Sequence, residues 1–259
     1  MQYGICQLSI IPVRSATEEV SELVTQLLFG EHYKILESRK NWSRIKTISD
    51  KCEGWIMNSQ LTFIPENEFN SIQENKGQKF VADLISYVAD TNEIVTPILL
   101  GSCIPDIPSL SVNFDGSILN SVQPKDNLIK TALLYLNAPE LKGGKSPFGI
   151  DSAGFTQMVY RINGYNILRT AENQSTQGTA LSFVEESEAG DLAFFDNVNG
   201  AIDHVGIIME NNYVIHVNGK VRIDRIDHTG IFNNDLRTYT HQLRVIKKVI
   251  KKKALIRAF

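Results

Sequence analysis

The chain has 259 residues, 42% of them apolar and 21% charged, which is an ordinary composition for a globular protein of one to three domains. Its formal net charge of −3 is too small to indicate a nucleic-acid partner, and no segment approaches 18 continuous apolar residues, so no membrane span is expected. Residues 1–5 contain neither a basic start nor a long apolar run. As written, the chain is therefore expected to be cytoplasmic, or periplasmic or secreted if it is a processed mature chain.

The cysteines indicate no metal or cofactor, and the basic C-terminal residues do not by themselves indicate a binding partner. Cys6, Cys52 and Cys103 are scattered without CxxC or other metal-ligand spacing, so neither a metal nor a cofactor is expected. Residues 243–259 hold seven lysines and arginines and no acid, interleaved with aliphatic residues. This pattern favours a terminal strand with a solvated basic end over a patch for a polyanion or a membrane surface. Nothing in the sequence indicates an oligomeric state.

The N-terminal half is predicted to be mostly β. Short apolar runs follow one another at a spacing of about ten residues, which is typical of a small barrel over residues 1–64. These runs lie at residues 4–13, 20–28, 33–38, 42–48 and 54–57. Residues 65–79 are expected to be a polar linker or a short surface helix, and weaker strand-like runs in residues 80–122 fit a second, degenerate barrel.

Residues 123–259 are predicted to form an α+β domain, because helical patterns come first and strand patterns follow. A helix is expected over residues 127–137 and a short one near residues 169–174. Strands are expected at residues 181–184, 191–195, 204–209, 213–217, 221–226 and 237–246.

A glycine-rich loop at residues 143–149 leads into a helix that begins at Asp151 or Ser152. The helix is indicated by one apolar face at positions i, i+3, i+4 and i+7, namely Phe155, Met158, Val159 and Ile162. A side chain at such a helix start feels the positive end of the helix dipole and nearby unpaired N–H groups. Proteins place an anion there, or a cysteine that is held as a thiolate. Here the position is occupied by Ser152.

Two histidines are predicted to lie on one face of a hairpin. If the turn is centred on Asn211 without a bulge, Gly206 opposes His216, and His204 shares the face of His216 within side-chain reach. A histidine base whose ring is oriented by a second polar group is the arrangement of a catalytic triad. A single strand histidine is more often structural, but two on one face beside a nucleophile position favour a site. The other histidines, His32, His228 and His241, are expected to be structural.

Four motifs follow one another in the C-terminal half: Gly-Gly-Lys-Ser-Pro-Phe-Gly-Ile-Asp-Ser-x-Gly-Phe-x-Gln at residues 143–157, Gly-Asp-Leu-x-Phe-Phe at 190–195, His-Val-Gly-Ile at 204–207 and Ile-His at 215–216. In this order they resemble the NlpC-type cell-wall peptidases, which are papain-like cysteine hydrolases. The N-terminal pattern, with Leu-Phe-Gly-Glu followed by two tryptophan-containing strands, resembles a bacterial SH3 domain. Together they point to the subgroup that cleaves the γ-D-glutamyl–L-diamino acid bond of murein peptides.

This resemblance implies a fold and a set of roles. The fold would be two N-terminal SH3-like barrels, at residues 1–64 and 80–122, followed by a papain-like domain at residues 123–259. The catalytic set would be Ser152 at the position of the family's nucleophilic cysteine, His204 as general base and His216 orienting it. The candidate substrate-binding residues are Asp151, Glu140, Lys142, Arg169, Thr170 and Asp203.

The chain departs from the family pattern at several site positions. Position 152 is serine instead of cysteine, Pro-Glu-Leu-Lys at residues 139–142 replaces Pro-Tyr-Leu-Trp, and Arg-Thr-Ala at residues 169–171 replaces Arg-Asp-Ala or Arg-Asp-Ser. A serine hydroxyl is far less acidic than a thiol and cannot be held ionised by the same field. An engineered Cys-to-Ser change would leave the rest of the site intact, so the several changes favour natural divergence.

Three functions remain open from the sequence. The first is an NlpC-type murein-peptide scaffold that is catalytically weak or inactive and diverged in its groove. The second is an active γ-D-glutamyl–diamino acid peptidase, with serine as a poor nucleophile or standing for a mutated cysteine. The third is an interaction module that uses the SH3-like barrels or the basic C-terminal tail. The expected partner in the first two cases is a murein-derived or related small peptide.

Overall fold

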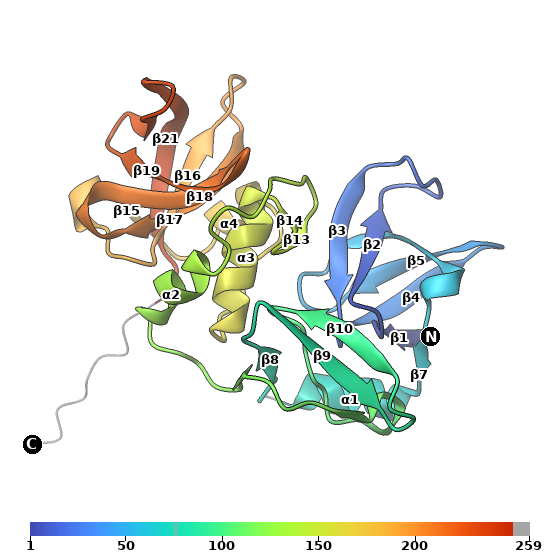
Figure 1. The fold of residues 1–259 in the computed structure, drawn as a ribbon. Coiled ribbons are helices and arrows are strands. Elements are labelled where there is room, and N and C mark those ends of the chain that lie inside the picture. The colour runs from blue at the N-terminus through green and yellow to red at the C-terminus, as the bar shows by residue number, and fades with distance from the viewer. Residues whose placement is uncertain (76, 251–259) are drawn as a thin grey trace, which may run out of the picture.

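The computed structural model describes residues 1–75 and 77–250, and the chain forms a mixed α/β fold with an SH3-like β-rich region at its N-terminus (Figure 1). The first lobe is a seven-stranded antiparallel sheet in the order β3-β2-β6-β5-β4-β1-β7. Its strands are β1 (Gln2–Ile5), β2 (Ile10–Arg14), β3 (Leu23–Leu28), β4 (His32–Ser38), β5 (Trp42–Thr47), β6 (Glu53–Met57) and β7 (Phe63–Ile64). The predicted run at residues 4–13 is two strands, because the chain turns between β1 and β2.

The second lobe consists of one helix and two small sheets. Helix α1 (Glu66–Glu74) buries Phe69 and Ile72, which is why the mostly polar segment forms a helix. Strands β9 (Ile85–Asp90), β10 (Val95–Leu99) and β11 (Val112–Asn113) pair in the order β10-β9-β11, and β8 (Phe80–Val81) pairs with β12 (Ile118–Leu119). Strands β8 to β11 and α1 share a hydrophobic core with β1 of the first lobe. The division into barrels at residues 1–64 and 80–122 stays a prediction.

The C-terminal lobe begins with helices and ends with a curved sheet. Its helices are α2 (Asn127–Leu133), α3 (Ser152–Ile162) and α4 (Ala171–Ser175). Its strands are β13 (Lys145–Ser146), β14 (Gly149–Ile150), β15 (Thr179–Leu181), β16 (Leu192–Asp196), β17 (Ile202–Met209), β18 (Tyr213–Asn218), β19 (Lys220–Ile226), β20 (Gly230–Asn233) and β21 (Thr238–Lys248). Short 3-10 turns lie at Asn58–Gln60, Pro108–Leu110, Val184–Glu186 and Glu210–Asn212.

The large C-terminal sheet runs β15-β21-β16-β17-β18-β19-β20, and β20 also pairs with β21, which closes the strands from β16 to β21 into a ring. The hairpin register places Gly206 opposite His216, as the sequence predicted, and the turn residue Asn211 has a positive φ of 59°. The basic residues Arg244, Lys247 and Lys248 lie on β21. The rest of the basic tail, from Lys251, lies outside the described residues.

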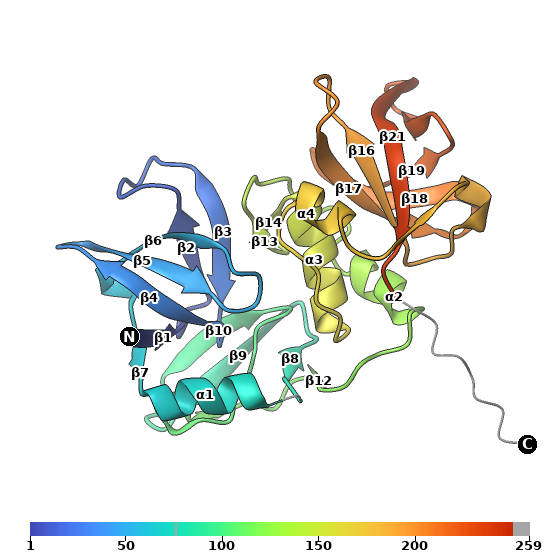
Figure 2. The same cartoon turned by 180° about the vertical axis from the view of Figure 1, so that it is seen from behind.

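Helix α3 is buried along its whole length and packs against β17 and β18. Both ribbon views place it between the C-terminal sheet and the two N-terminal lobes (Figures 1 and 2). The fold thus holds the start of α3 at the junction of the lobes.

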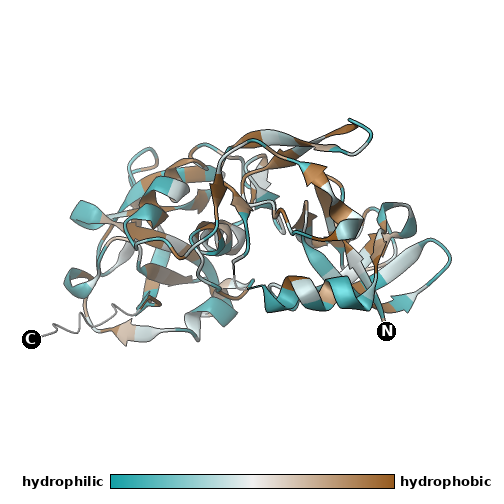
Figure 3. Ribbon diagram, turned by 90° about the horizontal axis from the view of Figure 1, so that it is seen from below, coloured by the Kyte–Doolittle hydropathy of each residue, from teal (hydrophilic) through white to brown (hydrophobic). Residues whose placement is uncertain are grey.

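Hydrophobic residues gather in the sheets, whereas hydrophilic residues predominate in the connecting loops (Figure 3). Among residues 1–75 and 77–250 no helix combines the length and apolar character needed to cross a membrane.

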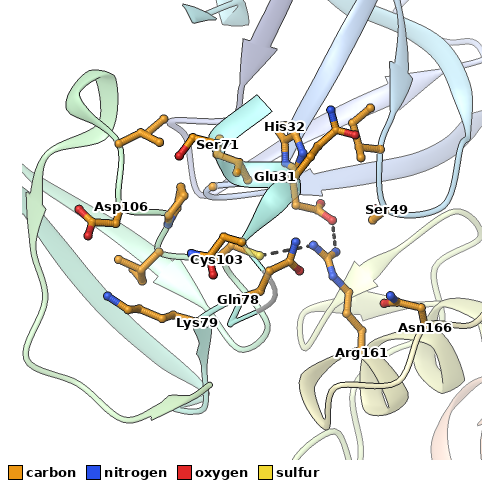
Figure 4. Close-up of a pocket in the computed structure, with 18 residues that line it drawn as sticks. Glu31, His32, Ser49, Ser71, Gln78, Lys79, Cys103, Asp106, Arg161 and Asn166 are labelled. Carbon is orange, nitrogen blue, oxygen red and sulfur yellow. Dashed lines mark hydrogen bonds and ion pairs between the residues drawn. The ribbon is translucent and has the colours of Figure 1, made fainter. Parts of the chain in front are cut away.

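A buried ion cluster joins the first lobe to this helix. Glu31 lies between β3 and β4 and is only 3% exposed, and both its oxygens contact the Lys145 ammonium, at 3.0 and 3.2 Å. Arg161, at the C-terminal end of α3, donates to the same carboxylate and also contacts the Cys103 sulfur at 3.4 Å (Figure 4). Burial alone would raise the pKa of Glu31, but Arg161 and Lys145 hold it below its usual value.

Candidate functional site

The start of α3 is organised by its N-cap residue, Asp151. The Asp151 side chain accepts a hydrogen bond from the Gly154 N–H at 2.5 Å, which caps the helix, and another from the Gly143 N–H at 2.8 Å. Gly143 has a φ of +79°, and a Cβ there would lie 2.1 Å from the Leu23 carbonyl oxygen of the first lobe. Ser152 is therefore the first helical residue, as predicted, and it is 8% exposed.

Arg169 completes this support. Its guanidinium binds both Asp151 oxygens, at 2.8 and 2.6 Å, and its Nε lies 3.3 Å from the Thr25 hydroxyl of β3. Arg169 is 5% exposed. Asp151 and Arg169, which the sequence analysis proposed as substrate-binding residues, bind one another in this structure. This pair fixes the position of the Ser152 backbone through the helix cap.

A chain of hydrogen bonds crosses the strands β17, β18 and β19. His204 Nε2 lies 2.9 Å from His216 Nδ1, and His216 Nε2 lies 3.0 Å from Asp224 Oδ2. Arg222 holds Asp224 in turn, with Nε at 2.6 Å from Oδ2 and Nη2 at 2.9 Å from Oδ1. His204, His216 and Asp224 are 8%, 0% and 1% exposed. The predicted neighbours His204 and His216 are thus brought together.

The acid at the end of this chain determines which nitrogens carry protons. Burial would raise the pKa of Asp224, but hydrogen bonds from His216 and Arg222 lower it, so the group is a carboxylate and can only accept. Burial lowers the pKa of His216 and, together with neighbouring His241 and His216, lowers that of His204 well below its usual value, so both rings are neutral. His216 therefore donates through Nε2, its Nδ1 accepts from His204 Nε2, and the lone pair of His204 lies on Nδ1.

The structure does not link this base directly to Ser152. Helix α3 packs against β17, which carries His204, but among the described residues the Ser152 hydroxyl has no hydrogen bond. The base lone pair on His204 Nδ1 is therefore not occupied by the serine in the resting structure. Such hydrogen bonds are commonly long or absent before a ligand is bound.

Most of the remaining candidate binding residues have local partners. Glu140 accepts from the Gly219 N–H at 2.6 Å, Lys142 pairs with Glu22 of the first lobe, and Thr170 accepts from the Asn173 N–H as the N-cap of α4. Glu140, Lys142, Thr170 and Asp203 are all exposed. Their roles in ligand binding stay predictions.

Sequence reasoning missed two members of the site. Asp224 pairs with Val214, so it lies diagonal to His216 and on the same face of the sheet. The alternation of side chains along β19 could have indicated this position. His241, which was expected to be structural, stacks its ring on that of His204, with centroids 3.9 Å apart and planes 25° apart. Its position depends on β21 pairing with β16 across a bulge, a long-range register that local patterns do not indicate.

The three histidines form a set of nitrogen donors. One ligand atom each of His204, His216 and His241 lies within 4.8 Å of the others. Burial, and the nearby His216, lower the pKa of His241 to about 4, so it too is neutral at neutral pH. The sequence expectation of no metal and no cofactor follows from the cysteine spacing, which carries no information on histidines from distant strands.

The hydrogen-bond chain makes a testable prediction for Asp224→Asn. Losing the carboxylate removes the obligatory acceptor, so we expect His216 and His204 to populate both neutral tautomers where the natural chain holds one. Imidazole ¹⁵N shifts and two-bond N–H correlations measure the tautomers directly. Asp235→Asn is the matched control, because Asp235 accepts from Arg222 at 2.9 Å but does not touch a histidine. A single tautomer retained in Asp224→Asn would contradict the assignment.

Two segments of the chain match known protein families. Residues 141–240 match the NlpC/P60 family, and residues 13–61 match the bacterial dipeptidyl-peptidase Sh3 domain. The chain is 37% identical over 93 residues to the gamma-D-glutamyl-L-lysine dipeptidyl-peptidase of Bacillus subtilis (strain 168), a match covering 35% of this chain and 31% of that protein. It is 25% identical over 251 residues to Dipeptidyl-peptidase 6 of Lysinibacillus sphaericus, covering 84% and 90% of the two chains.

A solved structure shares the fold. The crystal structure of an NlpC/P60 family protein from Bacillus cereus ATCC 10987 superposes with a TM-score of 0.81 at 18% identity, over 96% of this chain and 100% of that chain. The resemblance therefore extends over the N-terminal lobes as well as the domain that carries the histidines.

Proposed function

Because this chain joins an NlpC/P60 domain to an N-terminal bacterial SH3 domain, as peptidoglycan peptidases of that family do, we propose that it binds murein peptides containing a γ-D-glutamyl–L-diamino acid bond. We further propose that it cleaves them weakly or not at all. The observation that carries this second part is Ser152 as the first residue of α3. The bond type is taken from the relatives' own activity, gamma-D-glutamyl-L-lysine dipeptidyl-peptidase.

The site is built for a nucleophile that is easier to ionise than serine. A cysteine at a helix start can exist as a thiolate near neutral pH, because its reference pKa is about 8.5 and the helix dipole favours the anion. A serine hydroxyl must instead lose its proton during attack. The neutral His204 ring would have to accept that proton from a hydroxyl that is far less acidic than a thiol. Nucleophilic attack by Ser152 is therefore slow.

Three exposed residues of the proposed binding site support a changed ligand preference. Glu140 and Lys142 replace positions that are aromatic in similar enzymes, and Thr170 replaces an acid. In this chain each is tied to a neighbour: Gly219 to Glu140, Glu22 to Lys142, and the α4 backbone to Thr170. A peptide entering here meets two charged side chains in place of aromatic walls. We expect retained binding with lower affinity for the tripeptide that related enzymes cleave.

A second candidate function is an active peptidase in which cysteine stands at position 152. The intact chain from His204 through His216 to Asp224 favours it, because a binding protein has no need of an oriented base. The third candidate, an interaction module, is favoured by no contact of the described residues. Of its basic tail, Arg244, Lys247 and Lys248 lie on β21, and the residues from Lys251 lie outside the described part of the chain.

Calorimetry on the natural chain tests the proposal. The ligands are L-alanyl-γ-D-glutamyl-diaminopimelate and its α-linked isomer, which has the same composition and charge. We expect saturable binding of the γ-linked peptide, weaker than that of a cysteine-containing relative, with little binding of the isomer. Mass spectrometry of the same samples should show intact peptide. Equal binding of the two isomers, or none, would refute peptide recognition, whereas rapid cleavage would refute the loss of activity.

A further inference from the structure

Three histidines, His204, His216 and His241, bring their ring nitrogens close together, an arrangement that peptide binding does not require. We propose that His204, His216 and His241 bind one divalent transition-metal ion of the zinc class. The three residues come from β17, β18 and β21, and their rings converge at one end of the C-terminal sheet. This inference goes beyond the peptide-binding function and does not depend on it.

The spacing of the donors suits such an ion. Zinc binds imidazole nitrogen at about 2.0–2.1 Å, so two ligand nitrogens of a tetrahedral site lie about 3.4 Å apart. His204 Nε2 and His216 Nδ1 are 2.9 Å apart, and one ring nitrogen from each of the three histidines lies within 4.8 Å of the others. The first pair must open by a few tenths of an ångström and the third donor must approach. Side-chain rotations are sufficient for both changes.

The movement required falls mainly on His241. Its ring is stacked on that of His204 with 25° between the planes, so their in-plane lone pairs do not meet at a point. The planes of His204 and His216 already lie 83° apart, with their nitrogens facing one another. His241 is also the least buried of the three. Metal binding should therefore turn the His241 ring out of the stack and leave the other two rings near their present positions.

The proton balance is simple. His216 Nδ1 already presents a lone pair, because His216 carries its proton on Nε2 toward Asp224. In His204 the proton moves from Nε2 to Nδ1 within the neutral ring, and Nε2 becomes a donor to the metal. No proton is released and no oxidation state changes. His216 then has the arrangement common in zinc proteins, with a carboxylate accepting from the nitrogen opposite the metal.

The local charge favours a cation. The acids whose charges act on His216 and His241 are Asp224, Asp203 and Glu140, and Arg222 is the cation that acts on His216. The immediate surroundings of the imidazoles therefore carry a net negative charge, which a divalent ion would offset. With serine at position 152 the helix start supplies no thiolate, so the imidazoles are the strong ligands available and water would complete the coordination.

Zinc titration of the metal-free full chain by calorimetry, together with Co²⁺ absorption spectra, tests the proposal. His241→Phe keeps a flat ring over His204 but removes the donor, and His228→Asn is the control because His228 is exposed and outside the cluster. Asp224→Asn tests the outer carboxylate, whose loss should weaken binding about 10–100-fold. We expect one Zn²⁺ per chain and an intense tetrahedral Co²⁺ spectrum in the natural chain and in His228→Asn.

In His241→Phe the affinity should fall by at least as much as in Asp224→Asn, and the tetrahedral spectrum should disappear. Circular dichroism and a cooperative thermal unfolding transition like that of the natural chain establish that the variants are folded. Absence of saturable Zn²⁺ binding in the natural chain would overturn the proposal. So would equal affinity in the natural chain and folded His241→Phe, or a loss in His228→Asn as large as that in His241→Phe.

Discussion

Ser152→Cys should raise the rate of γ-D-glutamyl–diamino acid bond cleavage by on the order of 10³-fold or more, since nucleophiles acting with an oriented base commonly account for rate factors of that size. The thiol would occupy the first residue of α3, where the helix dipole and the unpaired N–H groups favour an anion. Its proton has an acceptor in His204 Nδ1, whose lone pair is directed by the hydrogen bonds to His216 and Asp224. The change adds no bulk beyond that of sulfur for oxygen.

The measurement is mass-spectrometric cleavage of L-alanyl-γ-D-glutamyl-diaminopimelate by the natural chain and the variant. Ser152→Ala sets the background, and Ser152→Cys combined with His204→Gln shows whether the new activity uses the base. Activity in Ser152→Cys that is absent when His204→Gln is added would mean that the substrate-binding residues are intact. The serine alone would then prevent cleavage. A silent Ser152→Cys chain that still binds the peptide would contradict this prediction and place the loss in the groove residues Glu140, Lys142 and Thr170.

Local patterns predicted the parts of the site that lie within one element or one hairpin. The start of the helix at Ser152 follows from its apolar period, and the pairing of Gly206 with His216 follows from a turn centred on Asn211. The family resemblance and the mixed fold were confirmed by the comparisons. His241 was missed because its place is set by β21 meeting β16 with a register shift. No local period encodes that pairing.

The same reason explains why the link between the lobes was not predicted. Glu31 lies 114 positions before Lys145 and 130 positions before Arg161 in the sequence. Each of the three, taken alone, looks like an ordinary surface charge. Only the folded chain shows that all three are buried, at 3%, 1% and 7% exposure. A buried charge needs a partner, so the three positions depend on one another even though the sequence gives no sign of it.

Glu31→Gln should lower the free energy of unfolding by about 3–5 kcal/mol, because it leaves two buried cations without their counter-ion. The Glu31 carboxylate also accepts from the Leu28 N–H at 2.7 Å, and an amide cannot serve all these donors. Urea unfolding followed by fluorescence measures the loss. Glu53→Gln is the matched control, since Glu53 also bridges two cations, Arg44 and Lys46, but on the surface, where little change is expected.

The consequence should reach the site as well as the stability. Lys145 belongs to β13 in the loop that leads to Ser152, and its backbone N–H donates to Gln26 of the first lobe at 2.8 Å. If Glu31 anchors this loop, Glu31→Gln should weaken binding of the γ-linked peptide under conditions where the variant is still folded, whereas Glu53→Gln should not. Equal stability of the two variants would mean that the buried cluster contributes no more than a surface pair, and the N-terminal lobe would then not be needed to hold the start of α3.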